Sequence, residues 1–149
     1  MKIFLAGIMQ GSHLGAVLHN QDYRERLARL LTEHLPEADV YDPMADHGDS
    51  LDYDDDQGRG VFMKHNAMCG EVDLLIAVVP EASMGTAIEM WQAHQAGRTV
   101  ISISPLSHNW AVRFLSDAVF PDMEAFESAL AGGKIAALVS GVADSPPDK

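Results

Sequence analysis

Glu89 is the residue whose type and position could most readily do chemistry. It closes the segment Ser83–Glu89, which contains Gly85 and follows the continuous apolar run Leu74–Val79. Such a run predicts a strand buried on both faces, as in a parallel sheet. A carboxylate in the first turns of the next helix then lies at the sheet edge where open α/β folds bind ligands. There it could attack the anomeric carbon of a sugar, or it could stabilise an oxocarbenium ion that forms at that carbon. The competing interpretation is a solvated helix carboxylate, or one paired with a nearby Arg.

A glycine-rich loop follows the first apolar run and ends at the same predicted edge. Gly7, Gly11 and Ser12 could form a nest of backbone amides that holds an anion or a ribose hydroxyl, with Gln10 beside them. The loop contains neither a Walker A motif nor the pattern GxGxxG. The alternative is a turn without a ligand.

An acidic stretch follows the second predicted strand at its carboxyl end. Asp42, Asp46 and His47 could border the same pocket. Most of the eight aspartates between Asp39 and Asp56 lie in this stretch, and a solvated acidic loop is the favoured interpretation.

Part of the same stretch has the spacing of a calcium-binding loop. Asp52, Asp54 and Asp56 have the spacing of the first three ligands of an EF-hand loop, but Gln57 and Met63 stand where that loop needs Gly and Glu. We therefore expect no calcium loop here.

Other metal or nucleophile motifs are weak. His65 and Cys69 lie four residues apart on a predicted helix, but two ligands do not make a metal site. No serine lies in a GxSxG elbow. We predict no metal and no other cofactor.

Composition limits the partners. The chain has 149 residues, 47% of them hydrophobic, and a formal net charge of −12. That charge argues against nucleic acid or an anionic membrane surface as a partner. A single cysteine, the absence of a signal-peptide pattern and the absence of a long apolar run predict a cytoplasmic protein.

Strand and helix patterns alternate along the chain. Strands are expected at 2–6, 39–41, 74–79, 99–103 and 119–120, and helices at 23–35, 60–71, 86–96, 109–115 and 122–130. This order predicts an α/β fold: a single-domain, doubly wound, Rossmann- or flavodoxin-like and mostly parallel five-stranded sheet flanked by helices. The domain is expected to span 1–139, and the small, polar, proline-rich stretch 140–149 is expected to be a flexible tail.

Three segments together resemble a known family. They are Ile3–Ser12 (IFLAGIMQGS), Ser83–Glu89 (SMGTAIE) and Ser104–Phe114 (SPLSHNWAVRF), with Asp73 between them. They closely resemble the nucleoside 2-deoxyribosyltransferase family, which includes the nucleoside 5'-monophosphate N-glycosidases. The resemblance covers most of the chain, and the spacing of Ser83, Gly85 and Glu89 is its most specific part.

The resemblance implies that Glu89 is the nucleophile. It would attack C1' of a nucleoside or nucleotide, and the glycosyl-enzyme would then pass to water or to another base. Family members acting on free nucleosides tend to carry Asp six residues before the glutamate, and the monophosphate hydrolases carry Ser. Ser83 therefore favours a nucleotide, because a hydroxyl can donate to a 5'-phosphate that a carboxylate would repel.

Three other functions are compatible with the same residues. One is a base-exchanging deoxyribosyltransferase, and another is a nucleotide-binding domain of the same fold without turnover. A third is a glycohydrolase acting on a larger N-riboside such as NAD.

Three positions depart from the family pattern. Phe4 stands where the family often has a Tyr that orients the glutamate, and Gln10 where the hydrolases place an Arg. His65, or Asn66 with a shift of one residue, matches a family Asp that handles the sugar hydroxyl or the leaving base. Either side chain could hydrogen-bond a ligand, but only His65 could donate a proton near neutral pH.

The family's shared-site region matches His108–Trp110. The resemblance implies a homodimer or higher homo-oligomer in which Asn109 reaches a neighbour's pocket. A polar Asn beside the large apolar Trp110 suits an interface. The alternative is that Trp110 packs on the core of its own domain.

Overall fold

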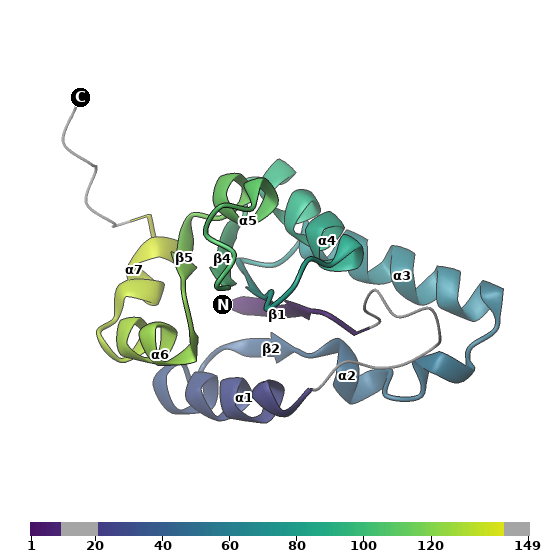
Figure 1. Ribbon diagram of the computed structural model, residues 1–149. Helices are drawn as coiled ribbons and strands as arrows, with labels where there is room; N and C mark the ends of the chain where they lie inside the picture. The colour runs from purple at the N-terminus through teal and green to yellow at the C-terminus, as the bar shows by residue number, and fades with distance from the viewer. Residues whose placement is uncertain (10–20, 142–149) are drawn as a thin grey trace.

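A five-stranded sheet forms the centre of the molecule (Figure 1). The computed structural model describes residues 1–9 and 21–141. The strands run in the order β2-β1-β3-β4-β5, and every pairing between neighbours is parallel. Their bounds are β1 Lys2–Gly7, β2 Asp39–Tyr41, β3 Leu74–Val78, β4 Thr99–Ile103 and β5 Ala118–Phe120. The predicted doubly wound α/β fold is confirmed, and the sheet is wholly rather than mostly parallel.

Helices cover both faces of this sheet. The helices are α1 Asp22–His34, α2 Pro43–Asp46, the short 3-10 helix η1 Ser50–Asp52, α3 Asp55–Cys69, α4 Met84–Gln95, α5 Trp110–Leu115, α6 Met123–Ala131 and α7 Lys134–Val139. Helices α1, α6 and α7 pack on one face, and α3, α4 and α5 pack on the other. Within the described ranges, no helix has the length and apolar character that crossing a membrane requires.

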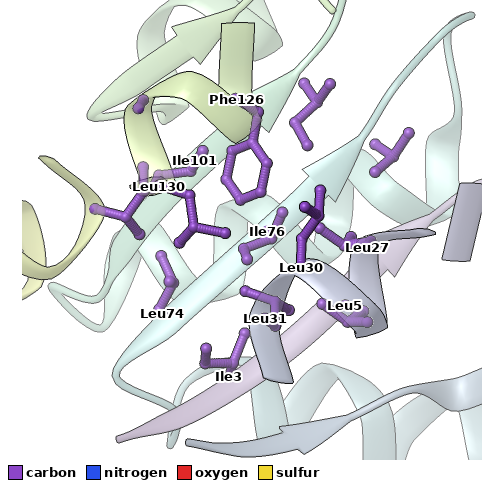
Figure 2. Close-up of a cluster of buried hydrophobic side chains, with 14 residues drawn as sticks. Ile3, Leu5, Leu27, Leu30, Leu31, Leu74, Ile76, Ile101, Phe126 and Leu130 are labelled. Carbon is purple, nitrogen blue, oxygen red and sulfur yellow. The ribbon is translucent and has the colours of Figure 1, made fainter. Parts of the chain in front are cut away.

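Alternation along the strands builds two apolar cores, one on each face. On β1, Ile3 and Leu5 face α1, whereas Phe4 and Ala6 face α3 and α4. Figure 2 shows the α1 side, where leucines of α1 meet the sheet and Phe126 of α6. Burial of both faces explains why β3 is a continuous apolar run.

The order of the strands determines where a ligand can bind. The chain winds from β1 outward to β2, returns to β3 on the other side of β1, and continues to β4 and β5. The direction of winding therefore reverses between β1 and β3. In parallel sheets this switch point leaves a crevice beyond the carboxyl ends of the strands. Gly7 ends β1, and the turn before α4 follows β3 at that crevice.

The structure differs from the sequence-based expectation in three places. Helix α3 begins at Asp55 rather than at Gly60, because Asp54 and Gln57 form a capping box that starts the helix earlier. The acidic stretch expected to be a loop contains α2 and η1. Helix α7, reached through Gly133 at a positive φ of 73°, was not predicted. The expected tail 140–149 lies outside the described residues from 142 onward.

Candidate active site

A cavity of about 1050 Å³ contains the predicted nucleophile. It receives residues from the end of β1, from η1, α3 and α4, and from the start of α5. Six of the predicted site residues line it: Gly7, His65, Ser83, Gly85, Glu89 and Asn109. Residues from four separate segments of the sequence therefore meet at the switch point of the sheet.

Glu89 lies in the second turn of α4. Burial raises the pKa of its carboxyl group from 4.5 to about 8, and the nearby positive charge of Arg24 opposes this effect. The carboxyl group has no hydrogen-bond or ion-pair partner among the described residues. At neutral pH it is mostly protonated. Its ionised form is poorly solvated and therefore a strong nucleophile, held beside open space.

Ser83 is the N-cap of α4. Its Oγ accepts from the Thr86 backbone N–H over 3.3 Å and from the Thr86 hydroxyl over 3.0 Å. Because the Ser83 oxygen only accepts in these two bonds, its own proton is free to donate into the cavity. A β-carbon at Gly85 would meet no atom within 4 Å, so the wall there is open backbone that a ligand can approach.

Asn109 caps α5, and its Oδ1 accepts from the backbone N–H groups of Ala111 and Val112 over 3.0 and 3.2 Å. It lines the cavity of its own chain. Its reach into a neighbour's pocket stays a prediction. Trp110 is 76% exposed, which rules out the alternative that it packs on the core of its own domain.

His65 lies on α3 and belongs to a cluster of aromatic rings that come from other elements. Its Nε2 lies 3.1 Å from the Tyr41 hydroxyl, and its ring meets Phe4 and His47 edge-on. Burial, helped by the charges of His47 and Lys64, lowers its pKa from 6.5 to about 4. The imidazole is therefore neutral at pH 7, which does not favour the predicted role of proton donor. Phe4 is fully buried and stacks on Tyr41.

Four other predicted residues, Asp42, Asp46, His47 and Asn66, do not line the cavity. Asp42 accepts from Arg24 over 2.6 Å and caps α2 through the Met44 backbone N–H. Its carboxylate is therefore already engaged within the protein.

His47 and Asn66 are also bonded within the protein. His47 Nδ1 lies 2.9 Å from the Tyr53 hydroxyl, and Asn66 donates to the Phe62 carbonyl over 2.8 Å. Gln10, Gly11 and Ser12 lie outside the described residues.

The sequence reasoning missed Tyr23 and Arg24, which lie on α1 behind Gly7. Arg24 is only 4% exposed. The signal was present in the apolar stripe of α1, because Arg24 precedes Leu27 by three residues and Leu31 by seven and so falls on the buried face. A buried arginine on such a stripe needs a dedicated partner, here Asp42.

No protein-family model matches the sequence, and no curated protein matches it.

Solved structures share the fold. One is described as a 2-deoxyribosyltransferase of Bacillus psychrosaccharolyticus, with 17% identity, a TM-score of 0.65, and coverage of 87% of this chain and 96% of that chain. A conserved protein of Enterococcus faecalis has 16% identity and a TM-score of 0.62 over 88% of this chain and 97% of that one. A CMP N-glycosidase of Clostridium botulinum has 20% identity and a TM-score of 0.52 over 88% and 98%. The chain thus has, over nearly its whole length, the fold of proteins described as a deoxyribosyltransferase and a nucleotide N-glycosidase.

Proposed function

We propose that this protein cleaves the N-glycosidic bond of a nucleoside 5'-monophosphate or nucleoside, with Glu89 as the nucleophile. The observation that carries the proposal is the environment of Glu89. It is a carboxyl group with a raised pKa and no partner among the described residues, in a cavity at the switch point of the sheet. The solved structures described as a 2-deoxyribosyltransferase and a CMP N-glycosidase support this kind of substrate.

The reaction has two displacements at one carbon. The ionised carboxylate of Glu89 attacks C1', and the electron pair of the C1'–N bond leaves with the base, which takes a proton from solvent. A glycosyl ester on Glu89 results. In the second step, water adds to C1' and loses a proton, the ester oxygen leaves as the Glu89 carboxylate, and the free sugar phosphate, or the free sugar from a nucleoside, is released. If a second base adds instead of water, the reaction is base exchange.

His65 is proposed to assist the second displacement. A neutral imidazole that lines the cavity can orient the attacking water and accept its proton as the bond to C1' forms. Its low pKa makes it a weak base and leaves little imidazolium at pH 7 to act as an acid. The Tyr41 hydroxyl, 3.1 Å from Nε2, would fix the orientation of the ring. This assignment replaces the proton-donor role predicted from the sequence.

Ser83 is proposed to bind the 5'-phosphate. Its hydroxyl proton is free while its oxygen is held by Thr86, and it lies at the start of α4, where backbone N–H groups favour an anion. The protein as a whole is acidic, so attraction of a phosphate has to come from such local donors.

A second copy of the chain is proposed to cover the mouth of the cavity. Met84, Ile88 and Trp91 recur on one stripe of α4, and Trp110 and Phe114 lie one turn apart on α5, which contacts α4. All five are exposed, Met84 to 87%. We call these five residues the α4–α5 apolar surface. Met84 and Ile88 also line the cavity, so a neighbour seated here would close it against water.

Release of free base from a panel of compounds tests the proposal. Wild-type protein is incubated with ribo- and deoxyribonucleosides, their 5'-monophosphates and NAD, each with and without a second free base, and the products are separated by chromatography. Free base from a monophosphate without added acceptor supports the hydrolase. Product only with the added base identifies a transferase, and release from NAD alone identifies the larger N-riboside. Binding without any product would identify a nucleotide-binding domain without turnover.

A further inference from the structure

Two hydrogen-bond donors with no partner lie behind Gly7. Tyr23 Oη and Arg24 Nη2 are buried, and neither has an acceptor in good hydrogen-bond geometry among the described residues. A β-carbon at Gly7 would collide with the Tyr23 hydroxyl and would lie 3.2 Å from Arg24 Nη2. Gly7 and Glu89 both line the cavity, and the two donors lie directly behind Gly7 on the α1 side of the sheet.

Arg24 cannot turn away from this position. Its Nη1 donates to Asp42 over 2.6 Å and to the Leu5 carbonyl over 3.3 Å, and its Nε donates to Gln21 over 2.5 Å. The guanidinium carbon also lies 5.4 Å from the centre of the Tyr23 ring. The guanidinium is therefore fixed, and it holds the phenol against the end of β1.

Tyr23 differs from the other two tyrosines of the chain. The Tyr41 hydroxyl pairs with His65, and the Tyr53 hydroxyl pairs with His47 and Asp49. Burial raises the pKa of Tyr23, so its phenol keeps its proton at neutral pH and can donate it. A buried hydroxyl without a partner lowers the stability of the fold. Such groups occur where a ligand, or a charge that forms during the reaction, accepts the missing hydrogen bond.

Glu89 is the matching acceptor. It too lacks a partner among the described residues, and it lies within electrostatic reach of both donors: Arg24 lowers the pKa of Glu89, and Glu89 raises that of Tyr23. From α3, the buried thiol of Cys69 also faces Glu89, and its raised pKa keeps it neutral. Tyr23 and Arg24 are thus the groups from α1 that can stabilise a negative charge on Glu89.

We propose that Tyr23 is the positioning residue for Glu89, donating its hydroxyl proton to the carboxylate when Glu89 ionises, with Arg24 holding the phenol in place. Its role in catalysis rests on the proposed function, but the contact itself does not. Protonated Glu89 has no need of the donor, whereas the carboxylate gains a charge-assisted hydrogen bond that makes ionisation easier and aims one oxygen. Gly7 is required because any side chain there would occupy the place of the hydroxyl.

The test is the titration of Glu89 in Tyr23→Phe, which removes the hydroxyl and keeps the ring. The signal of the Glu89 carboxyl carbon is followed by NMR in protein labelled with ¹³C-glutamate. It is identified as the signal that disappears in Glu89→Gln. The titration midpoint should move up by about one pH unit in Tyr23→Phe. Arg26→Gln is the matched control on α1, because it removes an exposed guanidinium paired with Glu124 and Glu127 and should leave the midpoint unchanged.

Kinetics provide the second measurement. At pH 7, kcat/KM of Tyr23→Phe should fall about tenfold through kcat, and the loss should shrink above the midpoints of both proteins. An unchanged midpoint, or a loss confined to KM, would overturn the proposal and make Tyr23 a packing residue or a substrate contact. If the midpoint moves but wild-type protein releases no base, the contact stands and the proposed function fails.

Discussion

Gly7 and Tyr23 share one space: the Tyr23 hydroxyl occupies the place that a β-carbon on residue 7 would take. Gly7→Ala must therefore displace the phenol, and we expect it to destabilise the protein by about 1–3 kcal/mol. Combined with Tyr23→Phe, which removes the colliding oxygen, the cost of Gly7→Ala should largely disappear. Urea unfolding of the two single variants and the double variant measures this coupling.

Gly85→Ala is the control for this pair. A β-carbon there meets nothing within 4 Å, and the residue lies in the first turn of α4. The free energy of unfolding of Gly85→Ala should equal that of wild type or be slightly higher. Equal costs for Gly7→Ala with and without the Tyr23 hydroxyl would show that the glycine is needed for another reason.

The raised pKa of Glu89 predicts a dependence of stability on pH. The unfolded carboxyl group titrates near 4.5 and the folded one near 8. Between these values the folded state holds a proton that the unfolded state has lost, so the contribution of Glu89 becomes less favourable as pH rises and is constant above pH 8. Glu89→Gln, which cannot ionise, should match wild type near pH 4 and be more stable at pH 9 by about 1–3 kcal/mol, allowing for solvent contact of the carboxyl group.

Unfolding curves at both pH values check this difference. Asp122, which caps α6 by accepting from the Ala125 backbone N–H at the protein surface, offers the comparison. Asp122→Asn should show no gain at high pH. A Glu89→Gln variant that is equally or less stable than wild type at pH 9 would contradict a partly buried carboxyl group without a partner.

Ser83 should set the preference at the 5' end of the substrate. Ser83→Asp keeps an N-cap for α4 but brings a negative charge to the proposed phosphate site. The preference for a monophosphate over its nucleoside, expressed as a free energy from the ratio of the two kcat/KM values, should therefore fall by about 2–4 kcal/mol. Ser83→Thr, which keeps the hydroxyl and the cap, is the control and should retain the preference. If wild-type protein treats both substrates equally, Ser83 does not bind phosphate.

The α4–α5 apolar surface predicts an oligomer. Trp110→Ser should shift the protein toward monomer in sedimentation velocity and lower base release, because the cavity loses its cover. Val119→Ser removes an exposed apolar side chain of the edge strand β5 that is not one of these five residues, and it should leave the assembly intact. A wild-type monomer at assay concentration would refute the proposed covering by a second copy.

The fold could be predicted because its signals were local. Buried strands such as β3 are continuous apolar runs, and Gly97, at a positive φ of 67°, follows the end of α4. The start of α3 was misplaced because Asp54 acts as a cap, whereas a cluster of aspartates resembles a loop in sequence. Helix α7 is only six residues long and has little periodicity to detect.

The site was predicted where one segment carries it and missed where distant segments meet. Ser83 and Glu89 lie on one turn and helix, so their spacing is visible in the sequence. The link from Arg24 to Asp42 joins a helix to a residue eighteen positions later, and only the structure shows that it removes Asp42 from the candidate ligands. The low pKa of His65 likewise arises from packing against Phe4 and His47.

The central claim is that Glu89 performs the chemistry, and the most direct measurement is base release by wild type and Glu89→Gln from the best substrate of the panel. The assay is run at pH 8.5, where wild-type Glu89 is mostly ionised. Glutamine keeps the shape and removes the nucleophilic charge, so kcat/KM should fall by roughly 10³-fold or more while the protein stays folded. Base release by Glu89→Gln within a few-fold of wild type would contradict the account.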